Sequence, residues 1–303
     1  MLDFRQLTAL RAVDEHGSVL AAAEALGWSQ PTVTHHLNGL ARLTRAPVVQ
    51  SSRAGTRLTP AGRLWLPHAS ALLERAARAQ ADVAHALETG RRRVRLGIFP
   101  TAAARLLPAL VGALSEAGYD PRITEGELHE LSEALVRLGL DAAVVFDLPG
   151  EARSTPPGTH RTSLFTERFS LIVSSQHPLA LGPPRRLHDF SGDPWILGVS
   201  DTDPGDANLL AAARAAGFEP INGPRSDDYR VVAAYVAAGL GVALIPELAL
   251  PSEAEGVAII NLADTTLSRE VSLLTAATLD HAAVELMSRV LAAEATLMTS
   301  DFD

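Results

Sequence analysis

The sequence of 303 residues contains no lysine and no cysteine. Without lysine there can be no Walker-type phosphate loop, no Schiff-base nucleophile and no Ser-Lys dyad. Without cysteine there can be no disulfide, no thiolate metal site and no cysteine nucleophile. These two absences remove several common classes of enzyme before any motif is considered.

Long apolar segments are also missing. The longest apolar run, residues 231–246, is shorter than the ~20 residues that a membrane-spanning helix needs, and it contains Gly239 and Gly241. The N-terminus has no basic cluster followed by an apolar segment, so we expect no secretion signal. Together with the absence of cysteine, these features predict a cytoplasmic protein.

Charge is distributed unevenly along the chain. Residues 1–93 carry 12 arginines and 7 acidic residues, a net charge of +5, whereas residues 94–303 carry 14 arginines and 28 acidic residues, a net charge of −14. Between Ala25 and Leu73 there are five arginines and no Asp or Glu. A basic unit joined to an acidic remainder predicts that only the first unit binds a polyanion such as DNA.

The basic unit shows the pattern of a helix-turn-helix. Apolar residues recur at helical spacing over residues 19–26 and 31–43. Ser18 and Ser29 precede these two segments, as N-cap residues do. Two short helices joined by a turn that contains glycine are typical of this motif. Because two short extended runs follow, we predict a winged helix-turn-helix over residues 1–59.

A long helix is predicted after the wing, over residues 60–92. Thr59-Pro60 provides an N-cap followed by proline at the first helical position. The apolar residues are spaced alternately three and four apart, which is the heptad pattern of a coiled coil. We expect this linker helix to pair with the same helix of another subunit, the alternative being a helix that lies on its own domain. The predicted seam consists of Leu66, Ala69, Leu73, Ala76, Gln80, Val83 and Leu87.

From Arg93 onwards, extended runs alternate with helical ones. Residues 94–98 and 142–146 read as strands, whereas residues 101–117 and 229–238 read as helices. This alternation predicts an α/β region over residues 93–303. The part near residues 163–265 has strands and helices of its own, which indicates two small domains.

Residues 29–34, Ser-Gln-Pro-Thr-Val-Thr, resemble the start of the recognition helix in LysR-type transcriptional regulators. Residues 17–23 resemble that family's upstream Gly-Ser and Ala-Ala positions, and residues 57–62 resemble its wing-to-linker junction. Residues 177–180 resemble a turn in the middle of its C-terminal domain, and residues 244–246 a late hinge. The resemblance therefore covers the whole chain in order.

Three positions depart from this pattern. Arg45 stands where a glycine is usual, Ala41 where a glutamate is usual, and Ser51 where an arginine is usual. The first departure affects where the recognition helix ends. The other two change the local charge.

The resemblance implies a specific architecture and function. The helix-turn-helix binds promoter DNA as a homodimer or homotetramer, and the linker helix pairs two subunits. The C-terminal region resembles a two-lobed periplasmic-binding-protein fold of type 2. Lobe I comprises residues 93–163 and 265–303, and lobe II comprises residues 164–264, so the chain crosses near Ser163 and Asp264. A small organic effector is expected in the cleft between the lobes.

Short polar side chains early in the recognition helix are expected at base edges, with the helix N-terminus near phosphate. Gln can pair with adenine, and Thr can contact a thymine methyl group. Arginines in and near the wing are suited to phosphate or minor-groove contacts. The adjacent His35 and His36 point to different helix faces, so they cannot chelate a metal together. The candidate DNA-binding residues are Ser29, Gln30, Pro31, Thr32, Thr34, His35, His36, Arg42, Arg53 and Arg57.

The effector site is expected where strands end and helices begin. Strand 94–98 is followed by a helix that opens near Thr101, whose amides suit an acceptor, and the resemblance adds the loop after residues 195–197. Leu128 stands where some relatives have a hydroxyl. Arginine is scarce in these loops, so a neutral or singly charged effector is expected. The candidate effector-binding residues are Pro100, Thr101, Ala102, Glu127, Leu128, Phe146, Asp147, Ser200 and Asp201.

Enzyme motifs are incomplete. The dinucleotide-like start at 239–241 lacks its last glycine at Leu244, and the zincin-like His129-Glu130 is followed by Glu133 instead of a second histidine. We therefore expect no catalytic residues, no metal and no cofactor. The sequence predicts a LysR-type regulator in the cytoplasm, at the nucleoid when bound to DNA. The alternatives are a solute-binding or transport module, against which the helix-turn-helix argues, and an α/β enzyme.

Overall fold

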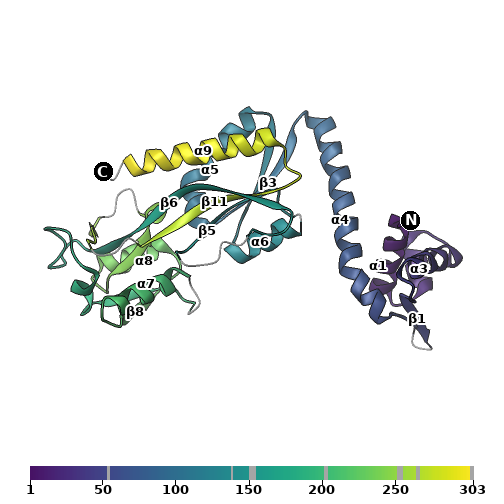
Figure 1. Cartoon of the computed structure of the whole chain (residues 1–303), viewed down its shortest axis with the longest axis horizontal. Helices are drawn as coiled ribbons and strands as arrows, with labels where there is room; N and C mark the ends of the chain where they lie inside the picture. Colours follow the sequence, from purple (N-terminus) through teal and green to yellow (C-terminus); the bar gives the residue numbers. More distant parts are fainter. Residues whose placement is uncertain are drawn as a thin grey trace. The chain divides into compact units, whose positions relative to one another are not determined.

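The computed structural model forms two compact units, residues 1–92 and 93–303 (Figure 1). The structure describes residues 1–52, 55–137, 139–149, 155–200, 204–250, 255–263 and 267–300, without the side chains of residues 204 and 298–300. Among these residues, no helix is long and apolar enough to cross a membrane.

Three short helices and a β-hairpin begin the first unit. α1 (Phe4–His16), α2 (Val19–Leu26) and α3 (Gln30–Thr44) precede the antiparallel strands β1 (Val49–Ser52) and β2 (Gly55–Leu58). This arrangement confirms the predicted winged helix-turn-helix.

The helix boundaries follow from local capping. The hydroxyls of Ser18 and Ser29 accept hydrogen bonds from the amides of Ala21 and Thr32, so both predicted N-caps are confirmed. Gly27 ends α2 in the left-handed conformation, with φ of 64°. The apolar faces of the three helices then meet in a core formed by Leu7, Leu10, Val13, Ala22, Ala23, Val33, Leu37 and Leu40.

The linker helix α4 (Pro60–Thr89) is 30 residues long and begins at the predicted cap, where Thr59 Oγ1 accepts from the Gly62 amide. Its first turns pack within the first unit. Ala69 is buried there, and Leu66 and Leu73 lie against the same core as α1. The first half of the predicted seam therefore packs within its own domain, against α1, and the pairing between subunits stays a prediction.

The second half of the seam is exposed. Val83 and Leu87 are 60% and 84% exposed, and Gln80 is exposed as well, whereas Ala76 is half-buried. The single helical stripe therefore has two environments. Its N-terminal part completes the core of the first unit, and its C-terminal part presents apolar side chains to the surroundings.

A mixed sheet forms the centre of the second unit. Among the described residues, seven strands lie in the order β10-β6-β11-β5-β3-β4, with β9 also paired to β6. β3 and β5 are parallel, and β11 runs antiparallel to both β5 and β6. The strands are β3 (Arg92–Ile98), β4 (Tyr119–Glu125), β5 (Ala142–Asp147), β6 (Thr159–Ser174), β9 (Ala243–Pro246), β10 (Val257–Ile260) and β11 (Ser268–Ala276).

Helices cover both faces of this sheet. α5 (Pro100–Glu116) and α9 (His281–Ser300) share a core with Val144 of β5, whereas α6 (Leu128–Val136) packs with Val145 on the other face (Figure 1). Because neighbouring residues of a strand point to opposite faces, the continuous apolar run of β5 is buried on both sides.

A second, smaller lobe surrounds two further strands. β7 (Pro194–Leu197) and β8 (Ile221–Arg225) pair in parallel. The helical elements of this lobe are η1 (Leu187–Phe190), α7 (Pro204–Ala215), α8 (Tyr229–Ala237) and η2 (Glu247–Ala249). The sequence did not predict β8, because Gly223-Pro224 argues against a strand.

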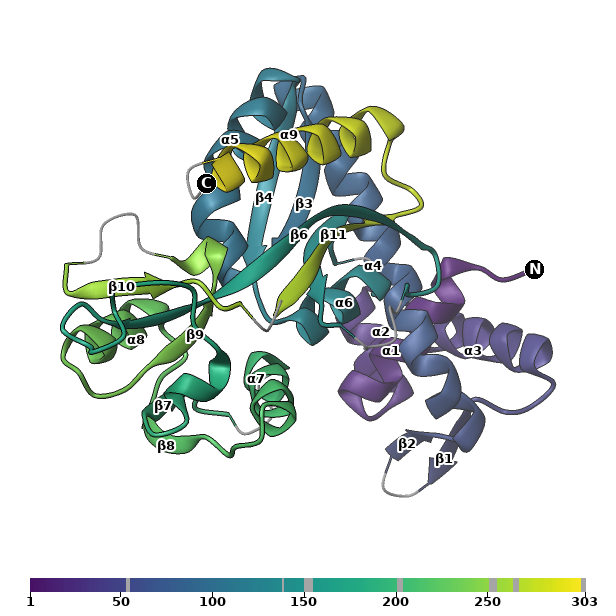
Figure 2. The same ribbon diagram turned by 60° about the vertical axis from the view of Figure 1, so that its left-hand side comes forward.

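The strand β6 joins the two lobes. Its first part pairs with β11, and its last part pairs with β9 and β10 (Figure 2). The sequence predicts two separate runs, 163–166 and 169–174, but the structure has one continuous strand. The polar Glu167 between these runs does not interrupt the strand, because it is buried in an ion pair with Arg269 of β11. Ser163 lies inside β6, and Asp264 lies outside the described residues.

Candidate DNA interface and effector site

The exposed face of α3 lies opposite its core face. Leu37 and Leu40 are buried, whereas His35, Asn38 and Arg42 are exposed and are spaced three and four residues apart. Residues at this spacing share one side of a helix. α3 therefore presents an unbroken polar and basic stripe.

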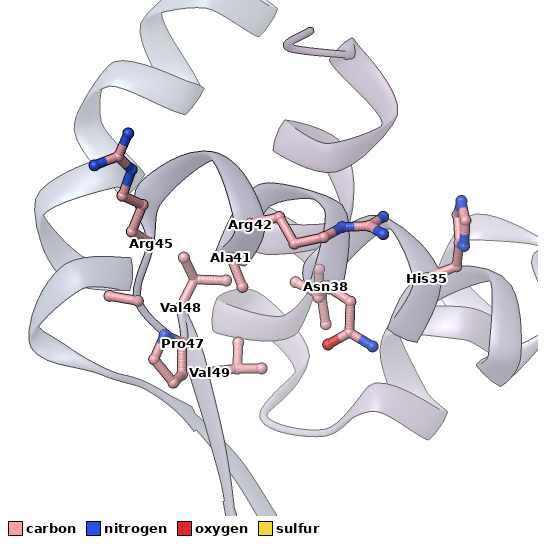
Figure 3. Close-up of a pocket in the computed structure, with 10 residues that line it drawn as sticks. His35, Asn38, Ala41, Arg42, Arg45, Pro47, Val48 and Val49 are labelled. Carbon is pink, nitrogen blue, oxygen red and sulfur yellow. The ribbon is translucent and has the colours of Figure 1, made fainter.

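A groove of about 590 Å³ runs along the C-terminal half of this stripe (Figure 3). One wall is α3, and the other is the segment that leads into β1. Thr59 holds that second wall in place. Its hydroxyl donates to the Pro47 carbonyl at 2.6 Å, and its amide donates to the Val48 carbonyl at 3.1 Å. The lining residues are His35, Leu37, Asn38, Ala41, Arg42, Arg45, Ala46, Pro47, Val48 and Val49.

The predicted DNA-binding residues at the start of α3 fall into two groups, according to whether their side chains are exposed or bonded within the helix end. Gln30, Pro31 and Thr34 are exposed, as is His35. Ser29 and Thr32 are engaged with each other, with their hydroxyl oxygens 2.8 Å apart. The first group is exposed, whereas the second stabilises the helix end.

His36 is directed differently from its neighbour His35. It is half-buried, and its ring lies 5.3 Å from the Trp28 ring in the turn between α2 and α3. This contact holds the two helices together at the turn. Its placement favours a packing role over contact with a base edge.

The wing is tied to the helical part of the unit. Thr56 in β2 donates its amide to the carbonyl of Gly17 at 2.9 Å. Arg57, the next residue, is exposed and lies opposite Gln50 of β1. The Arg57 side chain is therefore exposed on a strand whose position is held by hydrogen bonds. Arg53 lies outside the described residues.

In the second unit, Thr101 lies in the first turn of α5 and contacts a buried arginine. Nη2 of Arg269 donates to Thr101 Oγ1 at 2.7 Å, and Nε of Arg269 donates to Oε2 of Glu167 at 2.5 Å. The other carboxylate oxygen of Glu167 accepts from the Leu248 amide at 2.6 Å. The cluster thus links α5, β11, β6 and η2.

Aromatic rings enclose this arginine. Its guanidinium carbon lies 4.3 Å from the centre of the Phe146 ring, 4.8 Å from that of Phe99 and 5.8 Å from that of Phe169. Arg269 and Glu167 are only 4% and 2% exposed. A buried charge needs a partner, and here one carboxylate and the ring faces compensate one guanidinium.

The structure brings only some of the predicted effector residues together. Thr101 and Phe146 both contact Arg269, and Pro100 and Ala102 flank Thr101 in the first turn of α5. Asp147 is instead paired with Arg161.

The remaining candidates lie elsewhere in the unit. Glu127 caps α6, where its amide donates to Glu130 at 3.0 Å, and Leu128 packs against the cores on both faces of the sheet. Ser200 is exposed at the end of the segment that follows β7, and Asp201 lies outside the described residues. The hydrogen bond of Glu127 and the packing of Leu128 are separate from the polar contacts of Thr101.

Comparison with known proteins matches both units to one family. Residues 4–63 match the model "Bacterial regulatory helix-turn-helix protein, lysR family", and residues 88–296 match the "LysR substrate binding domain". The chain belongs to the LysR family of transcriptional regulators. It is a DNA-binding regulator with an effector-binding domain, and the alternative of a solute-binding or transport module is wrong because the same chain carries both parts.

The relatives of this LysR-type regulator include proteins named as a gene activator and as a transcriptional regulator. The chain is 32% identical to a "Probable hydrogen peroxide-inducible genes activator" of Mycobacterium avium, over 82% of this chain and 79% of the relative. It is 28% identical to the "HTH-type transcriptional regulator TfdS" of Cupriavidus pinatubonensis, over 90% of this chain and 92% of that relative. The solved structure of a Corynebacterium glutamicum OxyR C206 mutant is similar, with a TM-score of 0.61, 26% identity and coverage of 98% and 93%.

Four residues of these sites were not singled out in the sequence. Arg269 stands beside Glu270, and Glu167 stands beside Arg168, so the local sequence does not mark either residue as a member of a buried pair. Asn38 could have been predicted to lie on the exposed face of α3, because it is spaced three and four residues from His35 and Arg42. Arg45 was noted only because it replaces a glycine.

Proposed function

We propose that this LysR-type regulator reads promoter DNA with the exposed face of α3 and with the wing, and that its C-terminal unit holds a small organic effector beside Thr101. The functional parts would be the DNA-binding residues 1–59, the linker helix 60–92 and the effector-binding residues 93–303. The observation that carries the effector part is the contact between Thr101 and the buried Arg269.

The chemistry at Thr101 favours an effector with one polar or singly anionic group. The Thr101 hydroxyl accepts from Arg269, so its own proton remains to be donated to an acceptor. The first amides of α5 and the helix dipole also favour an acceptor there. Arginine is scarce in the loops of this site, but Arg269 reaches Thr101 from strand β11. Glu167 balances that charge, which argues against a doubly anionic effector.

We propose that effector binding is non-covalent. Two of the relatives described above are named for hydrogen peroxide or for a cysteine variant. This chain has no cysteine at any position, so it has no thiol to oxidise. We further propose that the chain has no catalytic activity and acts in the cytoplasm, at the nucleoid when bound to DNA, as a homodimer or homotetramer.

Thr101→Val should abolish the response to the effector, because it removes the hydroxyl and keeps the shape of the side chain. Binding to the upstream DNA without effector should stay within about twofold of wild type, because Thr101 lies in the other unit. Calorimetry against metabolites of the pathway encoded by neighbouring genes would identify a ligand. Thr101→Ser, which keeps the hydroxyl, should retain binding. If Thr101→Val binds that ligand as tightly as wild type, the proposed contact is wrong.

Two substitutions separate phosphate contact from base reading in the DNA-binding unit. Arg57→Ala should weaken binding to all duplexes alike and should lower the slope of log K against log salt by about one unit per lost contact. Gln30→Ala should instead cost roughly 1–3 kcal/mol on the cognate site and little on random DNA. Fluorescence anisotropy over a salt series measures both. Equal losses for Gln30→Ala on both duplexes would show that Gln30 does not read a base.

A further inference from the structure

Two arginines at the C-terminal end of α3 line the groove in Figure 3 and are free to bind a ligand. Arg42 lies on the last full turn of the helix, and Arg45 follows the helix end. Both are exposed, and neither side chain makes a hydrogen bond or ion pair with any residue that the structure describes. With His35 and Asn38, they continue the polar stripe of α3 beyond the residues proposed to read bases.

The backbone of Arg45 is strained. Its φ of 55° places it in the left-handed region, and it is the only such non-glycine residue in the described part of the chain. Here glycine carries no steric penalty, whereas a residue with a Cβ does. Glycine would end the helix at lower cost.

The end of α3 is held in this conformation by its neighbours. The Arg45 amide donates to the Ala41 carbonyl, and the Ala46 amide donates to the same carbonyl at 3.2 Å. The Thr44 hydroxyl lies 2.7 Å from the Ala46 carbonyl oxygen and 3.0 Å from that of Ala41. This network fixes the backbone from which the Arg45 side chain extends beside the groove. Such strain, where surrounding contacts maintain it, points to a functional constraint.

The charge around the groove identifies its occupant. Residues 25–73 contain no Asp or Glu, so no nearby acidic residue in sequence neutralises Arg42 or Arg45. The floor between them is apolar and includes Ala41, Pro47 and Val49. Arginine forks suit phosphate oxygens, and an apolar floor suits the sugars between them.

We propose that this groove binds the sugar-phosphate backbone of duplex DNA, with Arg42 and Arg45 each contacting a phosphate. The DNA interface thereby extends along the whole of α3, and the strained Arg45 is retained for this contact. The proposal rests on the proposed use of α3 in DNA binding. Since neither arginine would contact a base edge, the contribution is independent of base sequence.

The test is Arg45→Gly in the full-length protein. It should raise the unfolding midpoint of the first unit by about 4 °C, because it relieves the left-handed strain. It should also weaken DNA binding about tenfold at 0.1 M salt, on upstream and random duplexes alike, and lower the salt slope by about one unit per bound subunit. Stability and affinity therefore move in opposite directions, which a folding defect would not produce.

Matched variants complete the test. Arg45→Lys keeps the charge and should keep most of the salt slope. Arg11→Ala removes one charge from the same unit, at a side chain that pairs with Glu15 on α1, and should leave the slope unchanged. An unchanged slope and affinity for Arg45→Gly would overturn the proposal, and so would a loss confined to the cognate sequence or seen only with effector present. If Arg57→Ala and Gln30→Ala behave as expected in that case, only the groove contact fails.

Discussion

Glu167→Gln should destabilise the C-terminal unit by about 3–5 kcal/mol, because it leaves the buried guanidinium of Arg269 without its counter-charge. The pair is almost fully buried, and the carboxylate also accepts from the Leu248 amide. Glutamine preserves the shape of the side chain, so the loss reports the charge and its hydrogen bonds. Urea denaturation of the full-length protein, followed by the fluorescence of Trp195 in this unit, measures the effect.

Two further variants make this result interpretable. Glu133→Gln breaks the pair with Arg137, whose side chains are 63% and 79% exposed, and should change stability by less than about 1 kcal/mol. Glu167→Gln combined with Arg269→Met removes both charges and should be less damaging than Glu167→Gln alone. A loss below about 1 kcal/mol for Glu167→Gln would mean that the pair is not desolvated as the structure places it.

Val83→Glu combined with Leu87→Glu should dissociate the oligomer. Both side chains are exposed in the single chain, at the C-terminal half of the predicted seam. If they are buried against α4 of another subunit, two unpaired carboxylates in that contact should raise the dissociation constant at least about 100-fold. Sedimentation at several concentrations measures this, and tight binding to upstream DNA should be lost in parallel.

The choice of these two positions follows from the structure. Leu73 also belongs to the predicted seam, but a charge there would disrupt the core of the DNA-binding unit and would not test the oligomer. Ala81→Glu, an exposed position of α4 beside the seam, is the matched control and should keep the native mass. If the double variant also keeps its native mass, α4 is not the contact between subunits.

The features that local sequence determines were predicted well. Ser18 and Ser29 cap the helices that they precede, and Thr59 starts a helix of the expected length. Each of these helix starts depends on residues within one turn, so the local sequence is sufficient to predict it. The heptad spacing of α4 correctly predicted a helix with an apolar stripe, but spacing does not specify which segment packs against that stripe. Its first half packs against α1, which ends at His16, whereas α4 begins only at Pro60.

The effector cluster could not be predicted in the same way. Glu167 and Arg269 are 102 residues apart, and each lies next to another charged residue, Arg168 or Glu270, in its strand. Only the pairing of β6 with β11 makes them neighbours. At Arg45 the sequence predicted a change that the structure does not have. The replacement of a glycine suggested an altered end of α3, but hydrogen bonds from Thr44 and Ala46 preserve the usual helix end.

Fluorescence anisotropy with the full-length protein tests the central claim most directly. The DNA upstream of its own gene is compared with a random duplex of equal length at one salt concentration. A LysR-type regulator that reads bases through α3 should bind the upstream DNA at least about 10³-fold more tightly than the random duplex. Equal affinity for the two duplexes would contradict sequence-specific recognition by this unit.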